Sequence, residues 1–267
     1  MALAPAPSHL MVSVDTTRVV VGALLGLTAA GANVLGGSLV AHRQWSRRYL
    51  NYFIALGAGF MLATALLEMI PESLKLRGES GAGLLHDTNS VFLLVLGGYF
   101  LVHFFEHTIA PHFHFGEETH HHEISHAHAS YAALLGLGIH TFFDGVAIAS
   151  GLIVSTWLGA VIFVAIFLHK LPEGFTVASL MLASGQSRRA AFASSAILGC
   201  ATLLGMFFMF LVRGTVDYAL PISAGVTLYV AASDLIPEVN REPGVGMALL
   251  VFLGVAIMLG LKAMFHL

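Results

Sequence analysis

Two short stretches of this sequence place a histidine and a carboxylate one helical turn apart. "HTFFDG" holds His140 and Asp144, and "HKLPEG" holds His169 and Glu173. Residues four positions apart share one face of a helix, and ionisable groups in apolar stretches are costly and usually mark function. Two neighbouring helices that each present an imidazole and a carboxylate can supply four ligands to a divalent ion. We therefore predict a metal site; the alternative is a set of interhelical polar contacts.

A lysine inside the second stretch argues against a metal at first sight. Lys170 directly follows His169, and a cation repels a cation. Successive residues point about 100° apart around a helix, so the ammonium need not face an ion held by His169. We predict that Lys170 compensates a nearby carboxylate, with Asp144, Glu173 and Asp234 as candidates. The alternative is that it points into an aqueous path and tunes ion uptake.

Apolar stretches surround these residues along the whole chain. The 267 residues are 57% hydrophobic and 10% charged, whereas a soluble domain carries about 25% charged residues. This composition predicts an all-α polytopic membrane protein with a single transmembrane domain over 1–267, because each helical span needs about 20 apolar residues and barrel strands would be shorter and alternating. The eight expected spans are 19–41, 51–71, 90–110, 130–152, 156–182, 190–212, 217–238 and 244–265.

Two of these spans end in the same pattern. The second ends in "LLEMIPES" and the seventh in "ASDLIPEV", each reading acid-x-Ile-Pro-Glu. Because the two spans would exit on opposite sides, we predict an inverted repeat of helices 1–3 and 6–8 around a central helix 4–5 pair, which is typical of transporters; the alternative is a common way to end a membrane helix. The acids could line the ends of a pathway or be ordinary interface residues: Glu68, Glu72, Asp234 and Glu238.

The basic residues predict how the protein is oriented in the membrane. The clusters "HRQWSRRY" and "QSRR" favour a cytoplasmic side that also holds the loop 111–129, because Lys and Arg are enriched in cytoplasmic loops. We expect the plasma (inner) membrane, and no cleaved signal peptide, since the first ~18 residues lack the basic and apolar regions of one. The formal net charge of −3 gives no nucleic-acid signal, and the single Cys200 excludes an intrachain disulfide.

Histidines are unusually frequent, with 15 in the chain. His103, Glu106 and His107 lie near one face at the end of span 3 and could receive an ion leaving the core; a hydrogen-bonded helix end is the alternative. The following tract lacks the fixed spacing and the cysteines of a structural site, so we interpret it as a flexible capture or sensing loop, or else a solvated linker with incidental affinity. Its histidines are His112, His114, His120, His121, His122, His126 and His128.

These motifs together resemble the ZIP (Zrt-, Irt-like protein) metal transporters over nearly the whole chain. The resemblance implies import of Zn²⁺, or of Cd²⁺, Fe²⁺ or Mn²⁺, toward the cytoplasm by alternating access. The metal would be the substrate, with no resident cofactor, and the bilayer and a possible homodimer would be the partners. By motif position it implies His140, Asp144, His169 and Glu173 as ligands. Met61, in "GAGFMLATALLEM", would be a further ligand or a packing residue.

This sequence differs from the family pattern at the positions that would bind a second metal ion. Members with two adjacent metals typically show "HN" in span 4, an acid directly after the span 5 histidine and a Glu-Pro in span 6. Here these positions read Thr141, Lys170 and, in "SSAILGCATLLG", no carboxylate. The resemblance therefore predicts a mononuclear site in which the ammonium stands where a second cation would sit.

Two other functions could use the same residues. A membrane metallo-hydrolase would use His- and Asp-bound zinc and its water, but no HExxH motif and no nucleophile elbow occur. A haem cytochrome could use His140 and His169, but the companion acids would be poorly placed against a porphyrin.

Overall fold

The computed structural model describes residues 16–42, 47–79, 88–108, 126–241 and 244–265. It is 97% helical with no strand among these residues, and eight of its helical stretches are long and apolar enough to cross a membrane. The predicted all-α membrane fold is thereby confirmed. The elements are α1 (Thr16–His42), α2 (Arg47–Thr64), the π-helix η1 (Ala65–Met69), α3 (Ile70–Glu79), α4 (Thr88–Thr108), α5 (His126–Val154), α6 (Thr156–Ala183), α7 (Arg188–Leu211), the 3₁₀ turn η2 (Arg213–Thr215), α8 (Val216–Tyr229), the π-helix η3 (Val230–Leu235), α9 (Ile236–Arg241) and α10 (Val245–Phe265).

Some boundaries differ from those that the sequence predicts. The expected loop 111–129 extends too far toward the C-terminus, because α5 already begins at His126. The stretch "HAHASYAALL" favours a helix because it is rich in alanine, the strongest helix former. Spans 2 and 7 are longer than 51–71 and 217–238, because their helices continue beyond Ile-Pro-Glu to Glu79 and Arg241.

A π-helical turn precedes each Ile-Pro-Glu motif. Pro71 and Pro237 are the second residues of α3 and α9, directly after η1 and η3. A proline cannot donate to the carbonyl four residues before it, and π turns accommodate such breaks and often mark functional sites. At Pro71 the released carbonyl is that of Leu67, and Lys262 of α10 donates to it at 2.8 Å. The motif is therefore a structural element of both repeats.

Pro221, inside α8, releases another carbonyl. Arg77 of α3 is 2% exposed, and its Nε donates to the Asp217 carbonyl at 3.3 Å, while its Nη1 donates to Ser90 at 3.0 Å. Its guanidinium also stacks on Tyr218, 4.2 Å from the ring centroid. This arginine therefore ties α3, α4 and α8 together.

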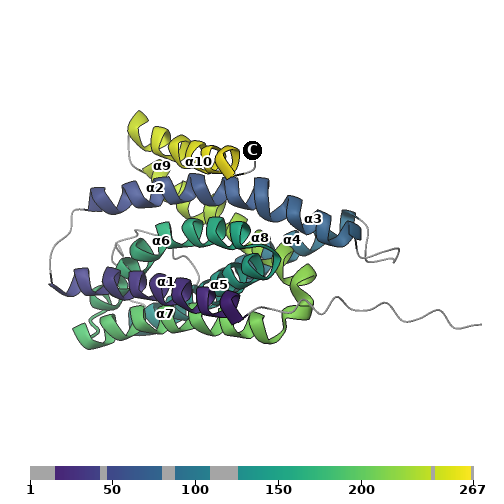
Figure 1. Ribbon diagram of the computed structural model, residues 1–267. Helices are drawn as coiled ribbons and strands as arrows, with labels where there is room; N and C mark the ends of the chain where they lie inside the picture. The colour runs from purple at the N-terminus through teal and green to yellow at the C-terminus, as the bar shows by residue number, and fades with distance from the viewer. Residues whose placement is uncertain (1–15, 43–46, 80–87, 109–125, 242–243, 266–267) are drawn as a thin grey trace, which may run out of the picture.

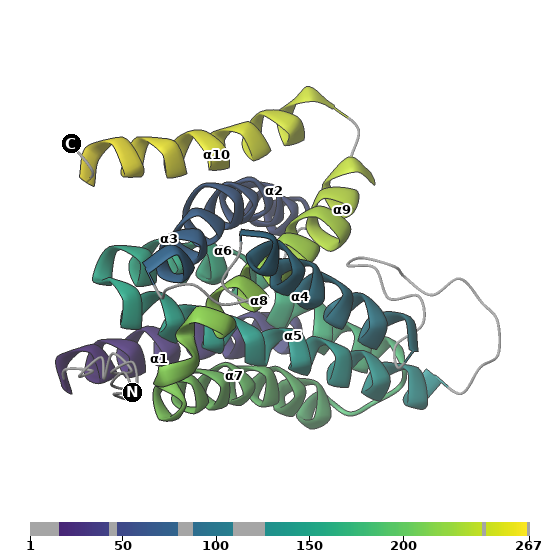
Figure 2. The ribbon, with the colours of Figure 1, turned by 90° about the vertical axis from the view of Figure 1, so that its right-hand side faces the viewer.

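The helices form two groups that meet along the middle of the molecule. In the first group α5 packs on α7 and α1 on α6; in the second α2 packs on α10 and α4 on α8, and the pairs α2–α6 and α5–α8 join the groups. Figure 1 shows α1 and α7 along one side and α10 on the other, and Figure 2 shows the same separation from the side. The eight spans are α1, α2–α3, α4, α5, α6, α7, α8–α9 and α10. Exchanging spans 1–3 with spans 6–8, and span 4 with span 5, maps each of these helix pairs onto another, so the contacts follow the predicted inverted repeat.

Glycines at matching positions make the close contacts in both repeats. The interval from Gly59 to Gly225 equals that from Pro71 to Pro237. Small residues let membrane helices approach closely, and a Cβ at these glycines would collide with a carbonyl oxygen of the neighbouring helix. The contacts are Gly59 to Val251, Gly225 to Val95, Gly145 to Thr202 and Gly174 to Asn33.

Candidate metal centre

Both histidine–carboxylate pairs point into one buried site between α5 and α6. His140 and Asp144 of α5 and His169 and Glu173 of α6 each offer a ligand atom, and these atoms all lie within 4.8 Å of one another. All four side chains are buried. The helical spacing, together with the packing of α5 against α6, thus assembles a compact set of two imidazoles and two carboxylates.

His169 is oriented by a backbone carbonyl. Its Nδ1 lies 3.2 Å from the Ala165 carbonyl oxygen, and its Nε2 lies 3.3 Å from Asp144 Oδ2. A carbonyl oxygen can only accept, so Nδ1 carries a proton and Nε2 is the ring nitrogen that faces the carboxylate and is available to a metal. This is the arrangement in which proteins hold metal-binding imidazoles.

His140 and Asp144 keep unmatched polar atoms. Both ring nitrogens of His140 and Oδ1 of Asp144 are buried without a hydrogen-bond partner among the described residues, and His140 Nε2 lies 3.3 Å from Asp144 Oδ2. A buried polar atom left unsatisfied costs about 1–3 kcal/mol. Coordination to a cation would satisfy one His140 nitrogen and Asp144 Oδ1, so the donor set fits a divalent metal.

Lys170 is fully buried within the same cluster, at 0% exposure. Its Nζ lies 2.6 Å from Asp144 Oδ2 and 2.5 Å from Glu173 Oε2, and it donates to Thr141 Oγ1 at 3.3 Å. The Thr141 hydroxyl in turn donates to Oε1 of Glu173. These contacts favour the predicted charge compensation over a lysine in an aqueous path.

Two further residues of the predicted site lie apart from these contacts. Met61 of α2 is buried in an apolar cluster that also contains Val161 and Ala165 of α6, so its role as a ligand stays a prediction. Asp234 lies buried in η3, and no ion pair joins it to Lys170 within the described ranges. Of the three carboxylates predicted as partners of Lys170, the observed ones are those of α5 and α6.

The end of α4 forms a separate polar group with the last residue of α8. Tyr229 donates to Glu106 Oε2 at 2.8 Å, the rings of His103 and His107 lie 4.0 Å apart, and the His107 ring donates to the His103 carbonyl at 3.1 Å. These bonds match the hydrogen-bonded helix end that the sequence left open, and a role in receiving ions stays a prediction. Sequence reasoning missed Tyr229, an aromatic residue in an apolar run.

Three of the four acids predicted at the pathway ends pair with nearby cations. Glu68 pairs with Lys262 at 2.8 Å, a contact that the lone lysine in the last span could have suggested. The other pairs are Glu72 with Lys75 at 2.9 Å and Glu238 with Arg241 at 3.4 Å. Within the His-rich tract, His112, His114, His120, His121 and His122 lie outside the described residues, and so do the side chains of His126 and His128.

Comparisons with known proteins agree with this arrangement. A family model described as "ZIP Zinc transporter" matches residues 17–133 and 116–262. The chain is 28% identical to Zinc transporter ZIP9-A of Xenopus laevis over 273 residues, which cover 84% of the chain and 88% of that protein. It is 27% identical to Zinc transporter foi of Drosophila melanogaster over 129 residues (47% of the chain) and 29% identical to Metal cation symporter ZIP14 of Mus musculus over 106 residues (39% of the chain). It spans only 18% and 22% of the length of these two proteins.

Proposed function

Because this chain belongs to the ZIP family of zinc transporters, we propose that it moves a divalent metal ion, foremost Zn²⁺, across its membrane toward the cytoplasm. Members of this family are transporters and not enzymes, which sets aside the membrane metallo-hydrolase that the sequence left open. The proposal also places the protein in the plasma (inner) membrane, with residues 111–129 on the cytoplasmic side.

The observation that carries the proposal is the buried cluster of two histidines and two carboxylates between α5 and α6. Imidazole nitrogens suit zinc and iron, and carboxylate oxygens also suit manganese, so Cd²⁺, Fe²⁺ and Mn²⁺ are further candidate substrates. Two carboxylates supply two negative charges, which lowers the cost of holding a divalent ion away from water although the buried Lys170 adds one positive charge. The site therefore suits one dication in a membrane interior.

Lys170 gives the site a way to release its ion. Its ammonium contacts Asp144 Oδ2 and Glu173 Oε2, and an incoming metal would compete for the same carboxylates. Two unit charges 4 Å apart interact by about 4 kcal/mol at an effective dielectric constant of 20. The ammonium would therefore oppose very tight binding, exclude a second cation, and reoccupy the carboxylates when the ion leaves.

The two helix groups provide a frame for alternating access. The ligands belong to α5 and α6, which face α8 and α2 of the other group. Inverted repeats with a site near their interface allow one group to move against the other, so that the site opens to each side in turn. This supports a carrier mechanism for the proposed transport.

Metal flux into proteoliposomes that contain the purified protein tests the proposal. We expect His169→Ala and Glu173→Ala to abolish uptake of Zn²⁺ while the protein stays folded, because each removes a ligand. Lys75→Ala is the control, since this lysine is 69% exposed and belongs to none of the predicted metal-binding groups. Deleting 112–128 should change the apparent affinity and leave transport intact. Loss of flux in the deletion but not in His169→Ala would contradict the site.

A further inference from the structure

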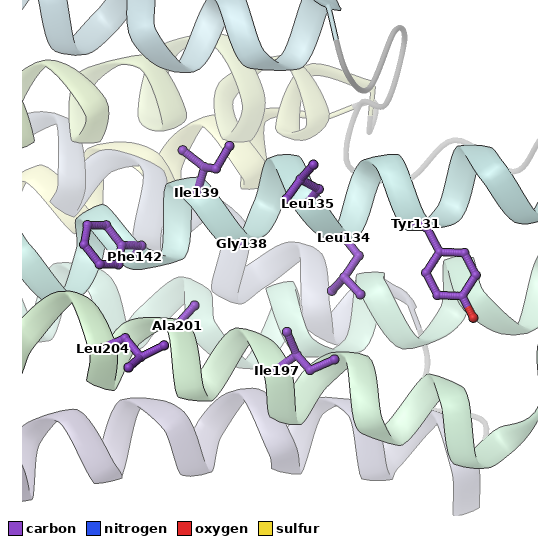
Figure 3. Close-up of a pocket in the computed structure, with 9 residues that line it drawn as sticks. All are labelled: Tyr131, Leu134, Leu135, Gly138, Ile139, Phe142, Ile197, Ala201 and Leu204. Carbon is purple, nitrogen blue, oxygen red and sulfur yellow. The ribbon is translucent and has the colours of Figure 1, made fainter.

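An apolar groove of about 520 Å³ opens between α5 and α7 on the outer surface of the helix bundle. Ala201 and Leu204 of α7 point toward α5 along it, with Phe142 at one end and Tyr131 at the other (Figure 3). Ligand sites in proteins typically measure about 300–1,000 Å³, so the groove is large enough for a specific ligand. Its lining is Tyr131, Leu134, Leu135, Gly138, Ile139, Phe142, Ile197, Ala201 and Leu204.

The groove exists because α5 and α7 touch at one end and diverge at the other. A Cβ on Gly145 would collide with the Thr202 carbonyl, and one on Gly205 with the Phe142 carbonyl, so the helices are in close contact there. At Gly138, further toward the start of α5, a Cβ would meet no atom within 4 Å. The missing side chain of this glycine leaves the widening space unfilled.

The inverted repeat contains a counterpart of this region in which aromatic side chains occupy the matching positions. The interval from His140 to His169 also relates Gly138 to Phe167 and Leu134 to Phe163, and these two rings lie 5.6 Å apart on α6. On the facing helix Ala32, which corresponds to Ala201, is only 6% exposed. One repeat thus carries two aromatic side chains at these positions, whereas the other carries a glycine and a leucine.

Polar and basic residues follow the Tyr131 end of the groove in the sequence. The Tyr131 hydroxyl donates to Gln186 Oε1 at 3.4 Å, and α7 begins two residues later with the exposed Arg188 and Arg189. Basic residues between membrane helices bind anionic lipid head groups, and guanidinium groups pair well with phosphate. An amphiphile with an anionic head and an apolar tail would match both ends of the groove.

We propose that the α5–α7 groove binds an anionic phospholipid, with one acyl chain beside Gly138 and the phosphate at Arg188 and Arg189. The lipid would come from the leaflet at the Tyr131 end of the groove. Two of the residues that it would contact, Ile139 and Phe142, flank His140 and Thr141 in the sequence. A bound acyl chain would therefore brace the helix that carries two of the proposed metal ligands.

Native mass spectrometry of the delipidated protein, titrated with phosphatidylglycerol or phosphatidylcholine of the same acyl chains, tests this site. We expect Gly138→Phe to weaken phosphatidylglycerol binding by about tenfold or more, which corresponds to 1.4 kcal/mol, because the ring takes the place that Phe167 takes in the other repeat. Gly97→Phe is the matched control. Gly97 is an exposed glycine of α4 whose Cβ would also meet no atom within 4 Å, so binding should not change.

The double variant Arg188→Gln with Arg189→Gln tests whether these two arginines bind the lipid phosphate. This variant should lose the preference for phosphatidylglycerol and keep its binding of phosphatidylcholine. If Gly138→Phe does not purify as a folded protein, Ala201→Leu fills the groove from the opposite wall and serves the same test.

Three outcomes would overturn the proposal. The first is unchanged phosphatidylglycerol binding in the groove-filling variant. The second is a wild-type protein that binds both lipids equally. The third is a Gly138→Phe variant that keeps its lipid but changes from dimer to monomer, because the groove would then be an interface between two copies of the chain. None of these measurements depends on metal transport, so failure here and failure of the transport proposal are distinguishable.

Discussion

Lys170→Met removes the ammonium from the centre of the site while keeping a long side chain in its place. In the metal-free protein Asp144 Oδ2 and Glu173 Oε2 would lose partners at 2.6 and 2.5 Å and stay buried without compensation. Removing one partner of a buried ion pair costs about 3–5 kcal/mol. For a protein of this size each 1 kcal/mol lowers Tm by about 2–4 °C, so we expect Tm to fall by roughly 6–20 °C.

Metal binding should respond in the opposite direction. In the wild type an incoming Zn²⁺ must displace or tolerate the ammonium, whereas in Lys170→Met it would itself neutralise the two carboxylates. A repulsion of up to about 4 kcal/mol between neighbouring charges is then absent, and each 1.4 kcal/mol is a factor of ten in affinity. We expect Zn²⁺ to bind roughly ten to a thousand times more tightly to the variant, and to be released more slowly.

Differential scanning fluorimetry and isothermal titration calorimetry on the purified protein, with chelator and with Zn²⁺, measure both effects. Lys75→Met is the matched control, because Lys75 also pairs with a glutamate three positions away but is 69% exposed, and surface pairs contribute about 0–1 kcal/mol. A Lys170→Met protein with an unchanged Tm in chelator, stabilised by Zn²⁺ no more than the wild type, would refute the compensation by Lys170.

Three other predictions concern Lys170, Lys262 and their carboxylate partners. Thr141→Asn with Lys170→Asp should raise the binding stoichiometry from one metal to two, as counted by calorimetry and by metal analysis; a stoichiometry of one would contradict the idea that the ammonium replaces a second cation. Thr141→Lys with Lys170→Thr should recover most of the Tm lost in Lys170→Thr alone, because position 141 also faces the Glu173 carboxylate; no recovery would show that the ammonium must come from α6. Lys262→Met should lower the free energy of unfolding by about 1–3 kcal/mol, since it leaves a carboxylate and a proline-released carbonyl without their donor; an unchanged denaturation midpoint would exclude a stabilising role for this lysine.

The parts of the structure that follow a helical period were predictable from the sequence. His140 with Asp144 and His169 with Glu173 lie on one face of each helix because they are four residues apart, and their burial follows from the apolar residues around them. The two Ile-Pro-Glu motifs indicated the inverted repeat because the same short sequence occurs at the ends of two different spans. Their π turns were not predictable, because a released carbonyl can be accommodated in several ways.

Contacts that depend on how the helices pack could not be derived from spacing. Tyr229 reaches Glu106, and Lys262 reaches Glu68, only because helices distant in the sequence lie side by side. The α5–α7 groove depends on Gly138 standing where the helices have begun to diverge, and a glycine in a membrane helix usually signals the opposite, a close approach. Spacing alone left Asp144, Glu173 and Asp234 as candidate partners of Lys170, and the pairing with the first two depends on how the helices pack.

The same repeat that relates the two histidines also relates Thr141 to Lys170, because both pairs are separated by the same interval. A symmetric frame with two acidic or amide groups at these positions would offer ligands for a second ion. In this chain the threonine holds Glu173 Oε1, and the lysine holds Glu173 Oε2 and Asp144 Oδ2. Three of the four carboxylate oxygens are thereby engaged, and Asp144 Oδ1 has no hydrogen-bond partner among the described residues. Under the proposed function, an arriving ion would meet His140 and this oxygen first and gain Glu173 only as the ammonium withdraws, so Thr141 and Lys170 together would make binding ordered and limit it to one ion.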